Sequence, residues 1–279
     1  MLQLLLAALA SSTGTVVDKI TLSWHKVPIR VFAPALFLVL FLITVTLLPW
    51  FGSVDVTQLL TFHVLSLFTL MVITAAAWNI FYYQGLQKES IEEFEAIILL
   101  VPLVTVVLGA LFLPEERNIH IVFAALIASI ALLFSHVNKR HLDFDRWTIG
   151  LILSVFLMAI EAVFIKKLLA VFSPVALYFA RTGFVFLALN TWYGSSLGHM
   201  KEVAARLTFV SGICGVISMV LKFYGYNAVG VIYTTLILII SPFLTIILDH
   251  FILHEPIHWR KIVSIIVILG AIIYATFAG

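Results

Sequence analysis

The sequence predicts an all-α membrane protein whose ten transmembrane helices form two inverted five-helix repeats. Three observations lead to this fold class. Of the 279 residues, 63% are apolar and 11% are charged, whereas soluble domains carry about 25% charged residues. Apolar stretches of about 20 residues, the length that crosses a bilayer, recur from Met1 to the C-terminus. The second half of the chain also repeats features of the first half at a constant spacing.

Charged residues, prolines and glycines divide the apolar runs into ten predicted helices. The predicted spans are 1–24, 28–50, 59–86, 90–113, 118–136, 147–169, 174–196, 207–227, 230–253 and 258–279. The linkers are short, and the longest, residues 136–146, leaves no room for an extramembrane domain. Tryptophans fall near predicted helix ends, as in an interfacial aromatic belt, with Trp78 as the internal exception.

An internal repeat relates the two halves, because residues 82–116 align without a gap with residues 222–256. The matched positions share one offset (225 − 85 = 140), and they are Gly85 with Gly225, Pro102 with Pro242, and Glu115 with Glu255. Five helices per repeat is an odd number, so the two copies insert into the membrane in opposite orientations. The predicted organisation is a first repeat over 1–136, a linker over 137–146 and a second repeat over 147–279.

Composition and absent motifs exclude several function classes. The net charge of +2 is small, and the basic residues lie mostly between apolar runs, so the expected partner is the lipid bilayer and not a nucleic acid. The single cysteine, Cys214, excludes an internal disulfide and a cysteine-based metal cluster. The sequence has no Walker A loop or other glycine-rich phosphate motif, so we expect neither ATP hydrolysis nor a bound cofactor.

Two segments carry a family resemblance. ISPFLTIILDHFILHEPIHWRKIVSIIVILGAIIYATF and KKLLAVFSPVALYFARTGFVFLAL resemble the EamA-type repeat of the drug/metabolite transporter superfamily, which has a Pro in the middle of the fourth helix, a Glu in the next turn and a Gly in the fifth helix. The first half departs from this pattern, because it has Ala128 in place of the Gly and no clear counterpart of Arg181. The resemblance implies a secondary transporter with a central cavity lined by helices 1, 3, 4, 6, 8 and 9.

These features predict a secondary transporter or exporter of small organic metabolites, such as amino acids or related polar solutes, working by alternating access. We expect it in a cell (inner or plasma) membrane as a multi-pass protein. Inverted repeats place a substrate site between halves that exchange inward-open and outward-open states. The substrate, the coupling ion and the direction of transport stay open, with protons as one candidate ion. Because one chain carries both repeats, we expect a monomer.

Two other function classes remain as alternatives. One is an intramembrane enzyme, because His254 to His258 reads HExxH, a metalloprotease signature that needs both histidines on one continuous helix. Pro256 follows the Glu and breaks a helix there, so we expect no metal site and no enzyme. The other alternative is a non-transporting scaffold or receptor, which would not need buried carboxylates.

The orientation of the termini also stays open. Lys and Arg number ten on one side of the predicted membrane and three on the other, which predicts external termini by the positive-inside rule. The family resemblance implies cytoplasmic termini in many members.

Ionisable groups inside the bilayer are costly, so they are candidates for function. Glu161, midway along the sixth predicted helix, is predicted to face the cavity and bind substrate or a proton, unless it is a structural carboxylate paired with a neighbouring helix. Lys222 is its predicted cationic partner or an anion-binding group. Asp18 and Lys19 are expected to reach the membrane interface, and Arg181 to have a structural role.

Polar and aromatic residues on helices 3, 4, 8 and 9 complete the predicted cavity. Glu95 lies one turn inside the fourth helix. Aromatic, amide and hydroxyl groups offer stacking and hydrogen bonds to an organic substrate, and the candidates are Trp78, Asn79, Tyr82, Tyr226, Tyr233 and Thr234.

Overall fold

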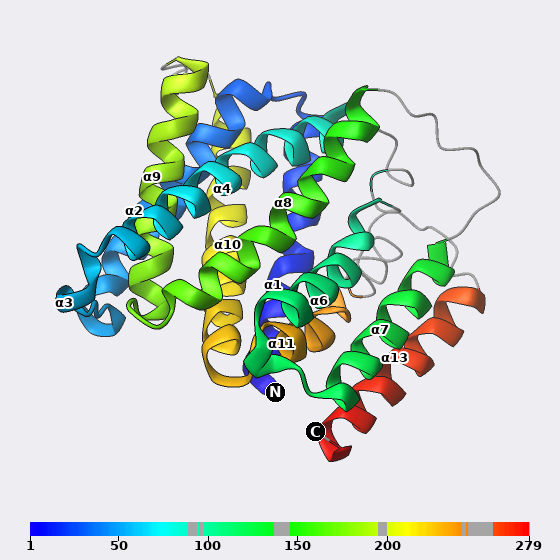
Figure 1. Ribbon diagram of the computed structural model, residues 1–279. Coiled ribbons are helices and arrows are strands. Elements are labelled where there is room, and N and C mark those ends of the chain that lie inside the picture. Colours follow the sequence, from blue (N-terminus) through cyan, green and yellow to red (C-terminus); the bar gives the residue numbers. More distant parts are fainter. Residues whose placement is uncertain are drawn as a thin grey trace.

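The computed structural model describes residues 1–88, 94, 97–136, 146–194, 200–241, 244 and 259–278. Within these ranges the regular structure is helical, apart from one isolated bridge between Val54 and Phe172. The helices, shown in Figure 1, are α1 (Leu2–Lys19), α2 (Ile29–Phe51), α3 (Val56–Leu59), α4 (Phe62–Lys88), α6 (Leu100–Phe112), α7 (Ile119–His136), α8 (Arg146–Leu168), α9 (Pro174–Tyr193), α10 (Glu202–Val229), α11 (Val231–Leu238) and α13 (Trp259–Ala278). A π-helical segment, η1 (Ile20–Trp24), extends α1, and a 3-10 turn, η2 (Pro114–Glu116), follows α6.

The predicted all-α membrane fold is confirmed. Six described helices are long and apolar enough to cross a membrane, and they are α1 with η1, α2, α4, α8, α9 and α10. Shorter apolar helices, α6, α7, α11 and α13, occupy the remaining predicted spans. The helix α10 begins at Glu202, five residues before the predicted start. Glu202 favours this earlier start, because a carboxylate in the first turn complements the helix dipole and pairs with Arg206 one turn later.

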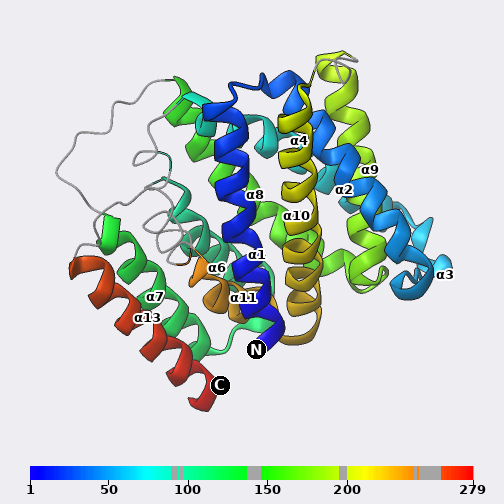
Figure 2. The same ribbon diagram turned by 180° about the vertical axis from the view of Figure 1, so that it is seen from behind.

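The packing of the helices follows the repeat. α4 of the first repeat packs along α8 of the second, and the equivalent helices α10 and α1 pack along each other in the same way. Two further pairs, α2 with α9 and α7 with α13, each join a helix to its own counterpart. This exchange of partners is what a two-fold axis between inverted repeats produces. Figures 1 and 2 show both termini at the same end of the molecule, as an even number of crossings requires.

Two glycines that the repeat pairs, Gly85 and Gly225, lie at equivalent helix contacts. A Cβ on Gly85 of α4 would lie 2.0 Å from Leu151 Cδ1 of α8. A Cβ on Gly225 of α10 would lie 2.6 Å from Leu4 Cδ2 of α1. Each glycine therefore allows close approach of one long helix of its own repeat to the first helix of the other repeat, as small residues do at membrane helix interfaces.

Candidate functional site

Two neighbouring cavities lie between the repeats. Cavity 1 has a volume of about 140 Å³ and cavity 2 a volume of about 250 Å³. They share four lining residues, which are Ser11 and Thr15 of α1 and Ser218 and Met219 of α10. The two cavities therefore adjoin along the contact between α1 and α10, where the first helix of one repeat meets the third helix of the other.

Cavity 2 draws lining residues from α1, α4, α6, α8, α10 and α11, the six helices that the family resemblance implied. Its charged member is Lys222, whose Nζ lies 5.5 Å from the centroid of the Tyr226 ring, a cation–π contact. Tyr82 lies on the α4 side, and Thr105 and Thr235 add hydroxyl groups from α6 and α11. This mixture of aromatic walls and a few polar groups is typical of sites for small organic molecules.

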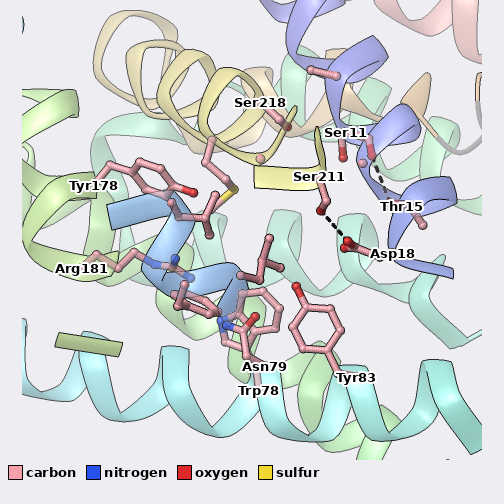
Figure 3. Close-up of a pocket in the computed structure, with 17 residues that line it drawn as sticks. Ser11, Thr15, Asp18, Trp78, Asn79, Tyr83, Tyr178, Arg181, Ser211 and Ser218 are labelled. Atoms are coloured by element: carbon pink, nitrogen blue, oxygen red, sulfur yellow. Dashed lines mark hydrogen bonds between the residues drawn. The ribbon is translucent and has the colours of Figure 1, made fainter. Parts of the chain in front are cut away.

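Cavity 1 extends toward α2 and α9. Figure 3 shows Trp78, Asn79 and Tyr83 of α4 on one side of it, and Tyr178 and Arg181 of α9 on another. Hydroxyl groups of Ser11, Thr15, Ser211 and Ser218 and the carboxylate of Asp18 complete the polar lining. A negative and a positive side chain therefore line one small space inside the membrane domain.

Glu161 lies behind the wall of cavity 1. It is 3% exposed, and its carboxylate accepts two hydrogen bonds from Arg181, from Nε at 2.5 Å and from Nη2 at 3.2 Å. The indole Nε1 of Trp78 donates a third bond of 2.6 Å to Oε2. Glu161 lines neither cavity, so the geometry favours the structural alternative that the sequence left open. Its partner is Arg181 and not the predicted Lys222.

Asp18 differs from the sequence-based expectation, because it does not reach the membrane interface. Asp18 is 8% exposed, and its carboxylate accepts a hydrogen bond from the Ser211 hydroxyl of α10. Asp18 lies more than one turn before the end of η1 at Trp24, and its contact with Ser211 of α10 places the carboxylate inside the bundle. Lys19 is buried as well, at 9% exposed.

The predicted site residues fall into five groups. Tyr82, Lys222 and Tyr226 line cavity 2, and Trp78 and Asn79 line cavity 1. Tyr233 and Thr234 line neither: the Tyr233 hydroxyl lies 2.9 Å from Thr276 Oγ1, and Thr234 packs against Gly225. Glu161 lies behind Trp78 and Arg181. Glu95 lies outside the described residues, as do Pro242 and the segment from His254 to His258.

Glu116 joins the repeats at the end of the molecule that holds the termini. Its Oε2 accepts a hydrogen bond of 3.0 Å from the backbone N–H of Ile232, at the start of α11. Lys166 Nζ of α8 lies 3.6 Å from Glu116 Oε1 and donates a 2.7 Å bond to the carbonyl of Tyr226. Gly230 is the N-cap of α11 and has a φ of +87°, and a Cβ there would lie 2.7 Å from the Glu116 carboxylate carbon. Glu116 therefore caps a helix of the other repeat.

Comparison with known proteins decides the family. The sequence profile of the EamA-like transporter family matches residues 1–136 and 145–277. The chain belongs to the EamA-like transporter family. The two matched segments correspond to the two predicted repeats, and they cover nearly the whole chain. The EamA-like membership makes the chain a multi-pass membrane transporter of small solutes.

A solved structure supports the EamA-like fold. It is a crystal structure of a protein that superposes with a TM-score of 0.74 over 99% of this chain and 97% of its own, at 16% sequence identity. At this identity the likeness shows the fold alone. No curated protein sequence matches the chain.

Proposed function

We propose that this EamA-like chain is a secondary transporter of a small polar organic solute of about amino-acid size, working by alternating access across a plasma or inner membrane. The observation that carries the proposal is cavity 2, because six helices from both repeats supply its walls. A cavity between two inverted repeats opens to one side or the other when the repeats rock against each other.

The lining supports an organic and polar substrate. Aromatic rings of Tyr82 and Tyr226 suit an organic body, while Lys222 and Thr235 offer charge and hydrogen bonds. The volumes of about 140 and 250 Å³ lie below the roughly 300–1,000 Å³ of pockets for drug-sized ligands, which favours a metabolite over a large drug.

The energy source in this proposal is a solute or ion gradient, since the sequence carries no phosphate-binding motif for ATP. A buried carboxylate in cavity 1 is consistent with a coupled cation, with the proton as one candidate. One chain supplies both walls of each cavity, and we therefore propose that a monomer transports.

Transport by the purified chain in proteoliposomes tests the proposal. The proteoliposomes are loaded with labelled amino acids, amines or organic acids, one at a time. The exchange of the labelled solute against unlabelled solute outside is then measured. Met158→Trp places a large ring in cavity 2 and is expected to reduce exchange at least tenfold without unfolding the protein. Phe156→Trp changes a residue on the same helix that is 48% exposed and outside both cavities, and it is expected to transport as the wild type does. Equal exchange by both variants would contradict a pathway through cavity 2.

A further inference from the structure

In its ionised form, Asp18 carries a charge in cavity 1 that the described side chains around it do not balance. It is 8% exposed and takes a hydrogen bond from the Ser211 hydroxyl. The ion pairs that the described part of the chain forms join Lys166 to Glu116, Arg181 to Glu161, and Arg206 to Glu202, so none includes Asp18. An ionised carboxylate has about four acceptor positions, and burying it without a partner is costly.

Arg181 also lines cavity 1 but does not supply the missing charge. Its guanidinium donates two of its five N–H groups to Glu161, at 2.5 and 3.2 Å. The close approach of this pair makes it neutral as a unit, and the indole N–H of Trp78 donates a further hydrogen bond to the same carboxylate. Among the described residues, cavity 1 together with Glu161 therefore holds one net negative charge when Asp18 is ionised.

The shape and lining of cavity 1 select the kind of cation. Four aromatic residues, Phe37, Trp78, Tyr83 and Tyr178, line the space with Asp18, and aromatic faces attract organic cations. A primary ammonium carries three donors, which the Asp18 carboxylate and the nearby hydroxyl groups can accept. A Ca²⁺-type ion needs six to eight oxygen ligands, usually with several carboxylates, and the described lining of this cavity offers one carboxylate. Figure 3 shows Asp18 and Tyr83 side by side at one end of the space.

We propose that Asp18 is the cation-recognition residue of the transporter and binds the ammonium group of an amine-bearing solute, with Tyr83 and Ser211 beside it. This assignment rests on the proposed transport function and names its substrate class. It also gives the two cavities different roles. Cavity 1 binds the ammonium end of the solute, and cavity 2 accommodates the rest of it through the shared wall at Ser218.

Binding to the purified full-length chain in detergent tests this assignment. Three four-carbon probes of different charge, n-butylammonium, butyramide and butyrate, are compared at pH 7 and equal ionic strength by the shift in the thermal unfolding midpoint. We expect n-butylammonium to stabilise most. Asp18→Asn keeps an acceptor for Ser211 but removes the charge, and it is expected to weaken the apparent affinity for n-butylammonium roughly tenfold or more.

Two further variants separate recognition from structure. Asp55→Asn changes the exposed N-cap carboxylate of α3, where Asn caps equally well, and it is expected to leave n-butylammonium binding unchanged. Ser211→Ala removes the hydrogen bond to Asp18 but keeps the charge, so the preference for n-butylammonium over butyramide is expected to persist. Loss of that preference in Ser211→Ala but not in Asp18→Asn would mean that the contact only joins α1 to α10.

Several outcomes would overturn the assignment. Equal stabilisation by butyramide would exclude recognition of charge, and stabilisation by NaCl matching that by n-butylammonium would make the site one for an inorganic cation. Proteoliposomes that exchange neutral or acidic solutes but no amine would leave the transport function standing and reject the role of Asp18. Asp18-dependent amine binding without exchange of any solute would reject the transport function instead.

Discussion

The Glu161 carboxylate of α8 accepts hydrogen bonds from two other helices. The donors are Arg181 of α9 and Trp78 of α4. Both charged side chains are almost fully buried, at 3% and 2% exposed. Such a pair is not a large net source of stability, because desolvation offsets the attraction between the charges. Removing one partner is different, since it leaves a lone buried charge.

We therefore expect Glu161→Gln to be less stable by about 3–5 kcal/mol, because Arg181 loses its counter-charge. Arg181→Met is expected to be similarly harmful, while the double variant recovers most of the loss. Thermal unfolding of the four proteins gives the coupling energy. Glu202→Gln is the matched control, because its ion pair with Arg206 joins side chains that are 78% and 77% exposed, and we expect no measurable change. Additive losses in the double variant would show that the pair does not act as a unit.

The residue scale is where sequence reasoning had least success, and the cause is physical. A mid-helix carboxylate such as Glu161 is easily recognised as unusual. Its partner, however, depends on which face of α9 turns toward α8. The sequence of α9 has no strong apolar stripe from which this face could be predicted. Asp18 is expected at the interface from the sequence because it lies late in the first predicted helix. The buried contact with Ser211, 193 residues away in sequence, has no local signal.

At the scale of helices the sequence was informative. A run of about 20 apolar residues has few alternatives to a transmembrane helix, and short linkers leave little freedom in their ends. The predicted span 147–169 and the observed α8, Arg146–Leu168, illustrate this. The repeat also identified Gly85 and Gly225 before their contacts were known, since close helix packing needs a small residue at the same place in each copy.

Gly85→Ala tests this packing. Its Cβ would lie 2.0 Å from Leu151 Cδ1 and 2.4 Å from Cγ, so α4 and α8 must separate or Leu151 must move, at a cost of about 1–3 kcal/mol. The control is Gly270→Ala in α13, where nothing lies within 4 Å of the added Cβ. That change is expected to be neutral or slightly stabilising, because Ala is the better helix former. Thermal unfolding midpoints that fall equally in both variants would contradict the close-packing role of Gly85.

Across the whole molecule, symmetric positions carry different chemistry. Trp78 and Ser218 are related by the repeat offset (218 − 78 = 140) and both line cavity 1. Tyr82 and Lys222 share this offset (222 − 82 = 140) and both line cavity 2. The duplication thus preserved which positions face the cavities, while the side chains there diverged. In the proposed transport cycle, a symmetric frame suits the exchange between two states, and the asymmetric lining is expected to give the solute a single binding direction.

In the proposed alternating access, the contact at Glu116 bears on the exchange between states. Glu116 of the first repeat caps α11 of the second, and Lys166 ties the same carboxylate to the end of α10. A change of state that separates the repeats at the end holding the termini must break these bonds. Glu115, the preceding residue, is exposed and provides a control at nearly the same position.

We expect Glu116→Ala to favour opening at that end, and Glu115→Ala to have little effect. The reporter is Thr235→Cys in cavity 2, in a background where Cys214→Ser removes the native thiol. Membrane-impermeant maleimide is applied to membranes of each orientation, so that labelling from the two faces is measured separately. The loss of hydrogen bonds to a charged group predicts labelling from the terminal face roughly tenfold faster in Glu116→Ala. Unchanged labelling from that face, or an equal increase in Glu115→Ala, would show that the Glu116 contact only stabilises the start of α11 and does not hold the repeats closed.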